Sequence, residues 1–437
     1  MLGSRKWIRQ AGRGKRNVTS SEPSQVSSGT TTVRAAAEEG LVGDFAPSSL
    51  TPGLISFSAG DYWYHSHSHA DFQICRELAK SRRVLIINSM GMRVPSLTSA
   101  DGWMRVRRKL NSTLHFVRRP APNITVLSPL FIPVYGPGWA AALNQKLVEL
   151  QIRAVARWAG GYTDRLVANP TAWGVARKLG TGPLVLYRVD HFSATEDVDS
   201  ALIRRLEDVT FAEADAVLYS SEALMDNEAV RHRGKGELFE HGVDRSLFDP
   251  TQIWDEPADL RDVAHPRVVM MGSFEKADRL EQTLEIAAAL PEVSFVFVGG
   301  GAGAVKESER VTSNVTFVGQ KQPSELPAYL AHMEVGLVVV TRSEWGTAAS
   351  PIKLKEYLAM GLPVVSTWFD GVEKHAATIR YGDSTESVVA ALRATLVDLG
   401  PSNHSHRIES VAADGWDARA QLLSTRLEQL RETQLHS

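Results

Sequence analysis

The chain has 437 residues, too many for one hydrophobic core at roughly 150 residues per domain, so we expect two or three domains. Hydrophobic residues make up 43% and charged residues 22% of the chain. This composition is typical of a soluble globular enzyme and excludes a collagen, a coiled coil and wholesale disorder. The 48 basic and 50 acidic residues nearly cancel, so the charge balance gives no indication of a nucleic-acid partner.

The single cysteine, Cys75, cannot form an intrachain disulfide, and its helical surroundings predict a small core residue. No apolar run reaches the roughly 18 residues of a membrane span, and the N-terminus lacks the apolar centre of a secretory signal. We therefore expect a protein that stays in the cytoplasm.

The first 52 residues carry little apolar pattern. A basic opening is followed by a tract rich in serine and threonine from Thr19 to Thr32. Such a segment cannot bury enough apolar surface to offset its ordering entropy, so we expect a disordered tail over residues 1–52. A membrane-surface anchor is the alternative interpretation of its basic start.

Over residues 53–248, short apolar runs alternate with helix-compatible segments such as Asp199–Ala212. The runs are Leu54–Phe57, Val84–Ile87, Ile124–Leu127, Leu166–Ala168, Leu184–Val189 and Ala216–Tyr219. Runs of this kind are typical of buried parallel strands, and their alternation with helices indicates βαβ units. We predict an α/β domain with a doubly wound, Rossmann-like sheet.

A second series of strands and helices follows the polar segment Asp249–Pro266. The predicted strands are Val268–Met271, Val293–Val298, Val315–Val318, Val335–Val340 and Pro363–Ser366, and the predicted helices are Glu281–Leu290, Ser324–His332 and Pro351–Met360. We expect a second doubly wound domain over residues 249–415. A C-terminal helix over residues 416–437, amphipathic from Asp417 to Gln434, would pack back on the first domain. Such sheets bind ligands beyond the carboxyl ends of their strands, which predicts a site in the cleft between the domains.

The segment from Ser350 to Val365 has the clearest local signals in the chain. Ser350 has the residue type of an N-cap, Pro351 suits the first helical position, and Gly361 suits a left-handed C-cap. One stripe of this helix is expected to be buried, formed by Leu354, Tyr357 and Leu358.

Lys353 is out of place in that helix. A cation in the first turn faces the positive end of the helix dipole, at a cost of about 0.3 to 1 kcal/mol. An anion bound there would remove the conflict, because the free backbone N–H groups and Lys353 would share a phosphate. Glu356, about one turn further on, could accept hydrogen bonds from ribose hydroxyls. The two residues predict a nucleotide diphosphate site; the alternative is a weak, solvated surface pair.

This segment resembles the donor-binding helix of GT-B glycosyltransferases, especially family 4 and the teichuronic acid and xanthan-type glucuronosyltransferases. The resemblance covers nearly everything after residue 53 and includes the loops Glu240–Asp244, Met271–Ser273 and Val298–Gly301. The helix motif is the more specific signal, because many α/β turns contain glycine clusters. The resemblance implies a GT-B fold, with two Rossmann-like domains facing a cleft. It also implies a nucleotide-sugar donor and no metal or other cofactor.

The donor-binding residues that the resemblance implies lie in the second domain: Gly272, Ser273, Gly299, Glu344, Ser350, Pro351, Ile352, Lys353 and Glu356. Many family 4 enzymes carry a second glutamate eight positions before the one matching Glu356, where this chain has Ala348. The nearest acid is Glu344. The inverting or retaining outcome therefore stays open. The familiar Asn-Gly-Val-Asp turn appears here as His241–Asp244.

The predicted strand Leu184–Val189 delivers Asp190 and His191 at its carboxyl end. An inverting sugar transfer needs a general base that takes the proton of the acceptor hydroxyl as it attacks the anomeric carbon. Asp190 is the candidate base, in keeping with the acidic residues that relatives carry after the corresponding strand, and His191 is the second candidate. The alternative is that Asp190 caps the following turn.

The segment from Asp61 to His69 also follows a strand end, and its alternating histidines could clasp a metal. The resemblance implies an acceptor-side loop instead, with Asp61, His67 and His69 as candidates. Residues 197–199 mimic the metal-binding DxD motif of the other major transferase fold, but they precede a predicted helix and are expected to cap it. We therefore predict no metal site.

Residues 105–119 contain no acid and six cations: Arg105, Arg107, Arg108, Lys109, Arg118 and Arg119. Apolar residues are interleaved with them. A lipid-linked acceptor lies at an anionic membrane surface, where each suitably placed cation contributes about 1 kcal/mol. We therefore expect membrane contact, chiefly through the first four cations. A surface helix that packs its apolar residues on the core is the alternative.

These observations predict a cytoplasmic enzyme, peripheral at the inner face of the plasma membrane. It would move a sugar from a nucleotide diphosphate donor to a surface polysaccharide, glycolipid or polyprenyl-linked acceptor of the cell envelope. One alternative is a nucleotide-sugar epimerase of the same fold, which has no acceptor site and no need of the basic stretch. The other is a noncatalytic nucleotide-sugar-binding partner that keeps the donor helix without the base.

Overall fold

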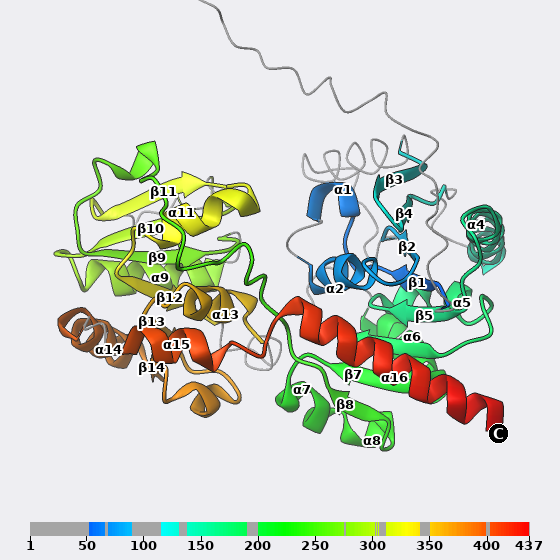
Figure 1. Cartoon of the computed structure of the whole chain (residues 1–437). Helices are drawn as coiled ribbons and strands as arrows, with labels where there is room; N and C mark the ends of the chain where they lie inside the picture. Colours follow the sequence, from blue (N-terminus) through cyan, green and yellow to red (C-terminus); the bar gives the residue numbers. More distant parts are fainter. Residues whose placement is uncertain are drawn as a thin grey trace, which may run out of the picture. The chain divides into compact units, whose positions relative to one another are not determined.

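The computed structural model describes residues 52–65, 69–89, 115–130, 138–189, 200–274, 277–301, 303, 305, 312–340, 350–398 and 403–436. All of them belong to one compact unit, Phe45–Ser437. The described strands form two sheets, one of eight strands and one of six. The prediction of an α/β fold with two doubly wound sheets is confirmed (Figure 1).

The first sheet has the strand order β3-β4-β2-β1-β5-β6-β7-β8. Its strands are β1 (Leu54–Phe57), β2 (Val84–Ile87), β3 (Val117–Ala121), β4 (Ile124–Leu127), β5 (Asp164–Val167), β6 (Leu184–Arg188), β7 (Ala216–Tyr219) and β8 (Gly236–Leu238). Only the pair β3 and β4 is antiparallel among these strands. The chain order reverses between β1 and β5, which makes that point the switch point of the sheet.

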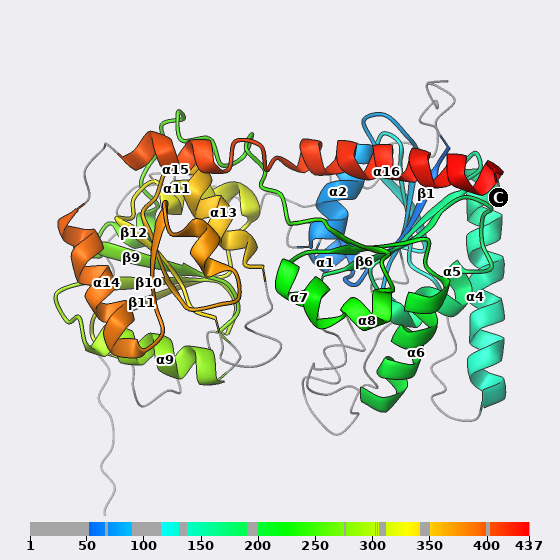
Figure 2. The same ribbon diagram turned by 90° about the horizontal axis from the view of Figure 1, so that it is seen from below.

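Helices cover both faces of the first sheet, because neighbouring strand residues point to opposite sides. Leu54 packs with Cys75 of α2 (Ala70–Leu78) and Leu423 of α16 (Trp416–His436), whereas Ile55 packs with Ile152 of α4 (Gly138–Trp158). Figure 2 shows α16 running beside α2. Cys75 is fully buried and free, as predicted.

The remaining helices of this part are short except for α6. They are α1 (Tyr62–His65), α5 (Trp173–Ala176), α6 (Ser200–Glu213), α7 (Glu222–Asn227) and α8 (Ala229–His232). The end of the basic stretch is a strand, because Arg118 and Arg119 belong to β3. The alternative of a surface helix is therefore wrong for those two residues. The Arg119 guanidinium lies 4.2 Å from the ring centroid of Trp158.

The second sheet has the strand order β11-β10-β9-β12-β13-β14, and all of its described pairs are parallel. Its strands are β9 (Arg267–Met271), β10 (Ser294–Val298), β11 (Val315–Gly319), β12 (Val335–Val338), β13 (Val364–Thr367) and β14 (Ile379–Gly382). Its helices are α9 (Ala277–Ala288), α11 (Leu326–Leu330), α13 (Ile352–Ala359), α14 (Thr385–Val397) and α15 (His404–Ser410). The switch point of this sheet lies between β9 and β12.

The connecting segment that follows β8 and the connecting segment that leads into α16 meet beside the second sheet. The N–H of Val243 donates to the carbonyl of Asp414 at 2.8 Å, and the N–H of Trp416 donates to the carbonyl of Val243 at 3.3 Å. A Cβ at Gly242 would lie 2.8 Å from the Trp416 ring, so this close approach needs glycine. The helices within the described ranges include none that is long and apolar enough to span a bilayer.

Candidate functional site

The carboxyl ends of β9 and β10 come together through two glycines. Gly272 has φ +135° and Gly299 has φ +152°, values that side-chain-bearing residues rarely adopt. A Cβ on Gly299 would lie 1.7 Å from the carbonyl oxygen of Gly272. Both glycines predicted to bind the donor therefore have backbone angles that favour glycine, and at Gly299 the neighbouring backbone also comes too close for a side chain.

Helix α13 follows β12 and begins at Ile352, with Pro351 at the N-cap position. The prediction of Ser350 as N-cap and Pro351 as first helical residue is wrong by one residue. Pro351 has ψ 106°, an extended value, and a residue before proline also avoids the helical region, so the helix starts only after both. No described side chain caps this terminus. The first N–H groups of α13, which have no partner within the helix itself, lie at the switch point of the sheet.

The other end and the buried face of α13 agree with the prediction. Gly361 has φ +69° after the last turn. Leu354, Tyr357 and Leu358 are buried, with exposed fractions of 2%, 0% and 0%. The N–H of Met271 donates to the Tyr357 hydroxyl at 2.9 Å, which ties the helix to the end of β9.

Lys353 reaches across the switch point. Its ammonium donates to the carbonyl of Met271 at 2.7 Å, and a Cβ on Gly272 would lie 2.8 Å from its Nζ. Burial lowers the pKa of Lys353 to about 7; nearby Arg279 lowers it too, while Glu356 opposes the shift. The ammonium thus lies over the strand end rather than in a solvated surface pair.

Glu356 has a half-buried carboxyl group beside Lys353. Burial raises its pKa to about 7; Lys353 counteracts this, and Asp244 adds to it. Its oxygens accept no hydrogen bond from any residue within the described ranges. A carboxyl group in this state is available to the donors of a ligand.

Arg279 is a site residue that the sequence interpretation missed. It lies in the first turn of α9, close enough to Lys353 to lower the pKa of that lysine. A signal was present in the sequence, because a cation in a first turn conflicts with the helix dipole as Lys353 does. Two basic side chains therefore lie near the start of two helices, next to the end of β9.

Lys355 anchors α13 to the two connecting segments. It is 5% exposed, and its ammonium donates to the carbonyl of His241 at 2.9 Å. It also pairs with Asp414 at 2.9 Å and with Glu240 at 3.3 Å. Burial lowers the pKa of His241 to about 3, with smaller effects from Lys355 and Arg419, so the imidazole is neutral. The position of α13 is thus coupled to the residues that join the two sheets.

Asp61 and His69 lie near the carboxyl end of β1. The Asp61 carboxylate accepts from the N–H of Trp63 at 3.1 Å and from the Asn88 side chain at 3.4 Å. His69 is the N-cap residue of α2 and contacts Phe72 edge to face. The other predicted site residues lie outside the described residues: His67, Arg105, Arg107, Arg108, Lys109, Asp190, His191 and Glu344.

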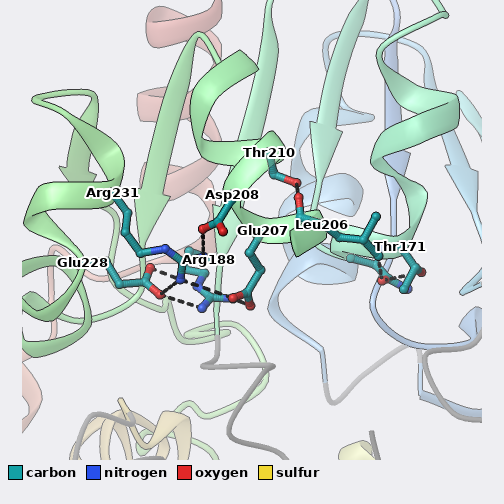
Figure 3. A network of polar contacts seen from close by, with 9 residues as sticks. Thr171, Arg188, Leu206, Glu207, Asp208, Thr210, Glu228 and Arg231 are labelled. Carbon is teal, nitrogen blue, oxygen red and sulfur yellow. Dashed lines mark hydrogen bonds and ion pairs between the residues drawn. The ribbon is translucent and has the colours of Figure 1, made fainter. Parts of the chain in front are cut away.

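A buried ion-pair network surrounds the end of β6 (Figure 3). Arg188, the last residue of β6, is 1% exposed and bonds Glu207 and Glu228, each at 2.6 Å. Arg231 of α8 joins both glutamates at 3.3 Å. Removing one partner of such a network leaves a buried charge uncompensated, at a cost of about 3 to 5 kcal/mol. The network holds the strand end that comes two residues before Asp190.

A cavity of about 350 Å³ adjoins Ser350. Its lining comes mainly from residues 220–227 and 369–375, together with Glu240. Lys374 pairs with Glu222 in this lining, and burial lowers the pKa of His375, so acidic groups predominate. Such a lining suits hydroxyl groups better than phosphates. No group of three or more metal-ligating side chains is found in the part of the chain that the structure describes.

Comparisons with known proteins concern the second sheet and the fold. Residues 265–398 match a family model described as glycosyl transferases group 1. Over 209 residues the chain is 26% identical to the putative teichuronic acid biosynthesis glycosyltransferase TuaH of Bacillus subtilis (strain 168). That match covers 46% of this chain and 53% of the relative, so the chain spans about half the length of the curated relative it matches.

Two solved structures with the same fold cover most of the chain. Sucrose-phosphate synthase from Thermosynechococcus elongatus matches at a TM-score of 0.64 and 17% identity, covering 87% of this chain and 99% of that one. A UDP-forming α,α-trehalose-phosphate synthase from Burkholderia vietnamiensis matches at 0.60 and 13%, covering 87% and 97%. At these identities the likeness concerns the fold.

Proposed function

We propose that this chain, whose residues 265–398 match the family model of glycosyl transferases group 1, transfers a sugar from a nucleotide diphosphate donor to a glycan or lipid-linked acceptor. The observation that carries the proposal is the start of α13, where Lys353 lies over the Gly272 strand end and Glu356 beside it accepts no hydrogen bond from the described residues. The name of the Bacillus relative, a putative teichuronic acid biosynthesis glycosyltransferase, supports an acceptor in the synthesis of a polymer of that kind.

In the proposed complex the donor diphosphate lies against the start of α13. The N–H groups of Ile352 and Lys353 bind its oxygens, and the Lys353 ammonium leaves the Met271 carbonyl to bind a phosphate oxygen. Arg279 adds a second cation from α9. Glu356 accepts hydrogen bonds from the ribose hydroxyls. The remaining predicted donor contacts, Ser273 and Glu344, stay proposals of the same site.

The proposed reaction breaks the bond between the anomeric carbon and the diphosphate oxygen. An acceptor hydroxyl attacks that carbon, its proton passes to Asp190 or, as the second candidate, to His191, and the nucleoside diphosphate leaves. Lys353, Arg279 and the helix terminus neutralise the charge of the leaving group. The proposal assigns this task to the chain itself, with no metal ion.

Catalysis is tested with the purified chain and a panel of UDP-, GDP- and TDP-sugars. Release of nucleoside diphosphate, with or without an added acceptor, is expected for at least one donor. A noncatalytic binding partner would bind a nucleotide sugar and release nothing. An epimerase would instead convert the donor into an isomeric nucleotide sugar without an acceptor, and that product would contradict the proposal.

Donor affinity is expected to be highest near pH 7 and to fall on both sides. Lys353 loses its proton as pH rises through about 7, because its pKa is lowered to that value. Glu356 gains a proton as pH falls through about 7, because its pKa is raised to that value. Both groups are charged together only around that pH. Calorimetric titrations with UDP-glucose, whose diphosphate is esterified at both ends and does not titrate near pH 7, check this expectation across pH.

Two variants identify which residue causes each fall in donor affinity. Lys353→Met is expected to remove the alkaline fall and Glu356→Gln the acidic fall, each at a lower overall affinity. A parent profile that stays flat over about one pH unit on either side of neutrality would contradict the assignment of both groups.

We also propose a cytoplasmic, membrane-peripheral location, supported by the basic stretch around Arg105. The variant in which Arg107, Arg108 and Lys109 are changed to Gln is expected to bind anionic vesicles more weakly, because each cation near such a surface contributes about 1 kcal/mol. Binding of the parent should fall with salt, since the Debye length is about 8 Å at 0.15 M. Vesicle sedimentation measures both effects.

The matched control changes three exposed cations elsewhere, Arg204, Arg205 and Arg261, to Gln. A chain beginning at Pro52 separates the basic tail from the stretch. The basic stretch is an ordinary solvated surface if the chain beginning at Pro52 does not bind anionic vesicles. The same conclusion follows if the control variant loses as much vesicle binding as the variant of the basic stretch.

A further inference from the structure

The carboxyl edge of the first sheet carries aromatic side chains that the donor chemistry does not use. Tyr62 and Trp63 lie on α1, directly after β1. Their ring centroids are 5.3 Å apart at an interplanar angle of 81°. The imidazole of His115 lies 4.9 Å from the Trp63 ring at 30°. The switch point of this sheet, where a ligand is expected, lies beside β1.

Buried polar side chains hold the Trp63 ring in one orientation. Its indole N–H donates to the Ser128 hydroxyl at 3.1 Å, and the Asn88 side chain donates to the same oxygen at 2.8 Å. The N–H of Tyr62 donates to Asn88 Oδ1 at 2.9 Å. Asn88 and Ser128 are both fully buried. The ends of β2 and β4 therefore fix the position of α1.

Trp63 as a residue is only partly buried, and the His115 imidazole lies against its ring. Trp63 and Tyr62 are half-buried, His115 is exposed, and the half-buried Asp61 carboxylate belongs to the same turn. An aromatic cluster with an exposed imidazole beside a carboxylate suits a pyranose, whose C–H groups contact the rings and whose hydroxyls donate to the carboxylate. Because the ring is already immobilised, little side-chain entropy is lost when a ligand binds.

We infer that Trp63, with Tyr62 and Asp61, forms the subsite for a pyranose ring of the sugar acceptor. The inference rests on the proposed glycosyl transfer, which requires an acceptor beside the first sheet. It assigns Trp63 a role in acceptor specificity and none in donor binding.

The test uses the full chain labelled with 5-fluorotryptophan and observed by ¹⁹F NMR in the presence of UDP. The signal missing from Trp63→Phe identifies Trp63. Methyl β-D-glucopyranoside and methyl β-D-glucuronide are the probes, and mannitol, an open-chain polyol without a ring face, is the control. We expect at least one glycoside, and not mannitol, to shift the Trp63 signal.

Binding of that glycoside, followed through saturation-transfer NMR, is expected to weaken about tenfold in Trp63→Leu. The matched control is Trp158→Leu, because Trp158 is 51% exposed on α4 and stacks with Arg119. This variant should bind the glycoside like the parent. Trp63→Phe keeps a ring and should retain most of the binding, which a loss of folding would not allow.

A Trp63 signal that shifts with neither glycoside overturns the inference. An equal loss of glycoside binding in Trp158→Leu overturns it too. Calorimetry with UDP on the same samples separates the two proposals. A chain that binds UDP while its Trp63 signal stays unmoved retains the donor site and loses only the acceptor subsite. A glycoside shift without UDP binding supports the aromatic subsite and contradicts the donor site.

Discussion

Asp190→Asn is expected to lower sugar transfer by about 10²-fold or more, the usual contribution of a positioned general base. Donor affinity should stay near that of the parent, because the proposed donor contacts come from α9, α13 and the ends of β9 and β10. The residue follows β6 by two positions, where the ion pairs of Arg188 hold the strand end. Initial rates of nucleoside diphosphate release, with calorimetry for affinity, measure the two effects separately.

His191→Asn is the matched comparison for this prediction. If the large loss of turnover appears in that variant instead, His191 takes the proton. Unchanged turnover in Asp190→Asn would exclude the role, and a retained anomeric configuration in the product would contradict a single inverting base.

Lys353→Met is expected to weaken binding of a nucleoside diphosphate about 30-fold or more, because it removes one partner of a charge-assisted bond to phosphate. The same change should stabilise the ligand-free fold. The folded-state pKa of Lys353, about 7, lies below the ordinary 10.5, so folding disfavours the ammonium. The penalty is complete below about pH 7 and disappears as pH rises toward 10.5. Chemical unfolding at several pH values checks this sign.

Lys355→Met is the control on the same helix. Lys355 pairs with Asp414 and Glu240 and donates to the His241 carbonyl. Its removal takes the donor from that carbonyl and leaves Arg419 as the one cation paired with both carboxylates among the described residues, so it should destabilise the fold. Opposite signs for the two lysines are the expected result. If Lys353→Met destabilises the fold as Lys355→Met does, Lys353 has a structural role and the donor site is misplaced.

Interior strands could be predicted from the sequence because most of their residues are apolar and buried. The predicted bounds of β1, β2, β4 and β7 agree with the structure. The strands that were missed, β3, β8 and β14, have exposed or half-buried residues. Such strands lack the continuous apolar run that marks a buried parallel strand.

The local features of α13 were predictable, whereas its surroundings were not. Gly361 and the buried stripe follow from helix chemistry alone. The contact of Lys353 with Met271 and the burial of Lys355 depend on segments far away in the sequence. For the same reason nothing local indicates that His241 is a buried, neutral imidazole.

The central claim is that a nucleotide diphosphate binds at the start of α13. Thermal unfolding of the full chain with UDP, GDP, TDP and their sugars tests it most directly, because a ligand at 100 times its dissociation constant stabilises the folded state by about 2.7 kcal/mol. We predict that one nucleotide class raises the unfolding temperature of the parent and that Lys353→Met abolishes most of the rise. No shift with any nucleotide, or an equal shift in Lys353→Met, would contradict the account.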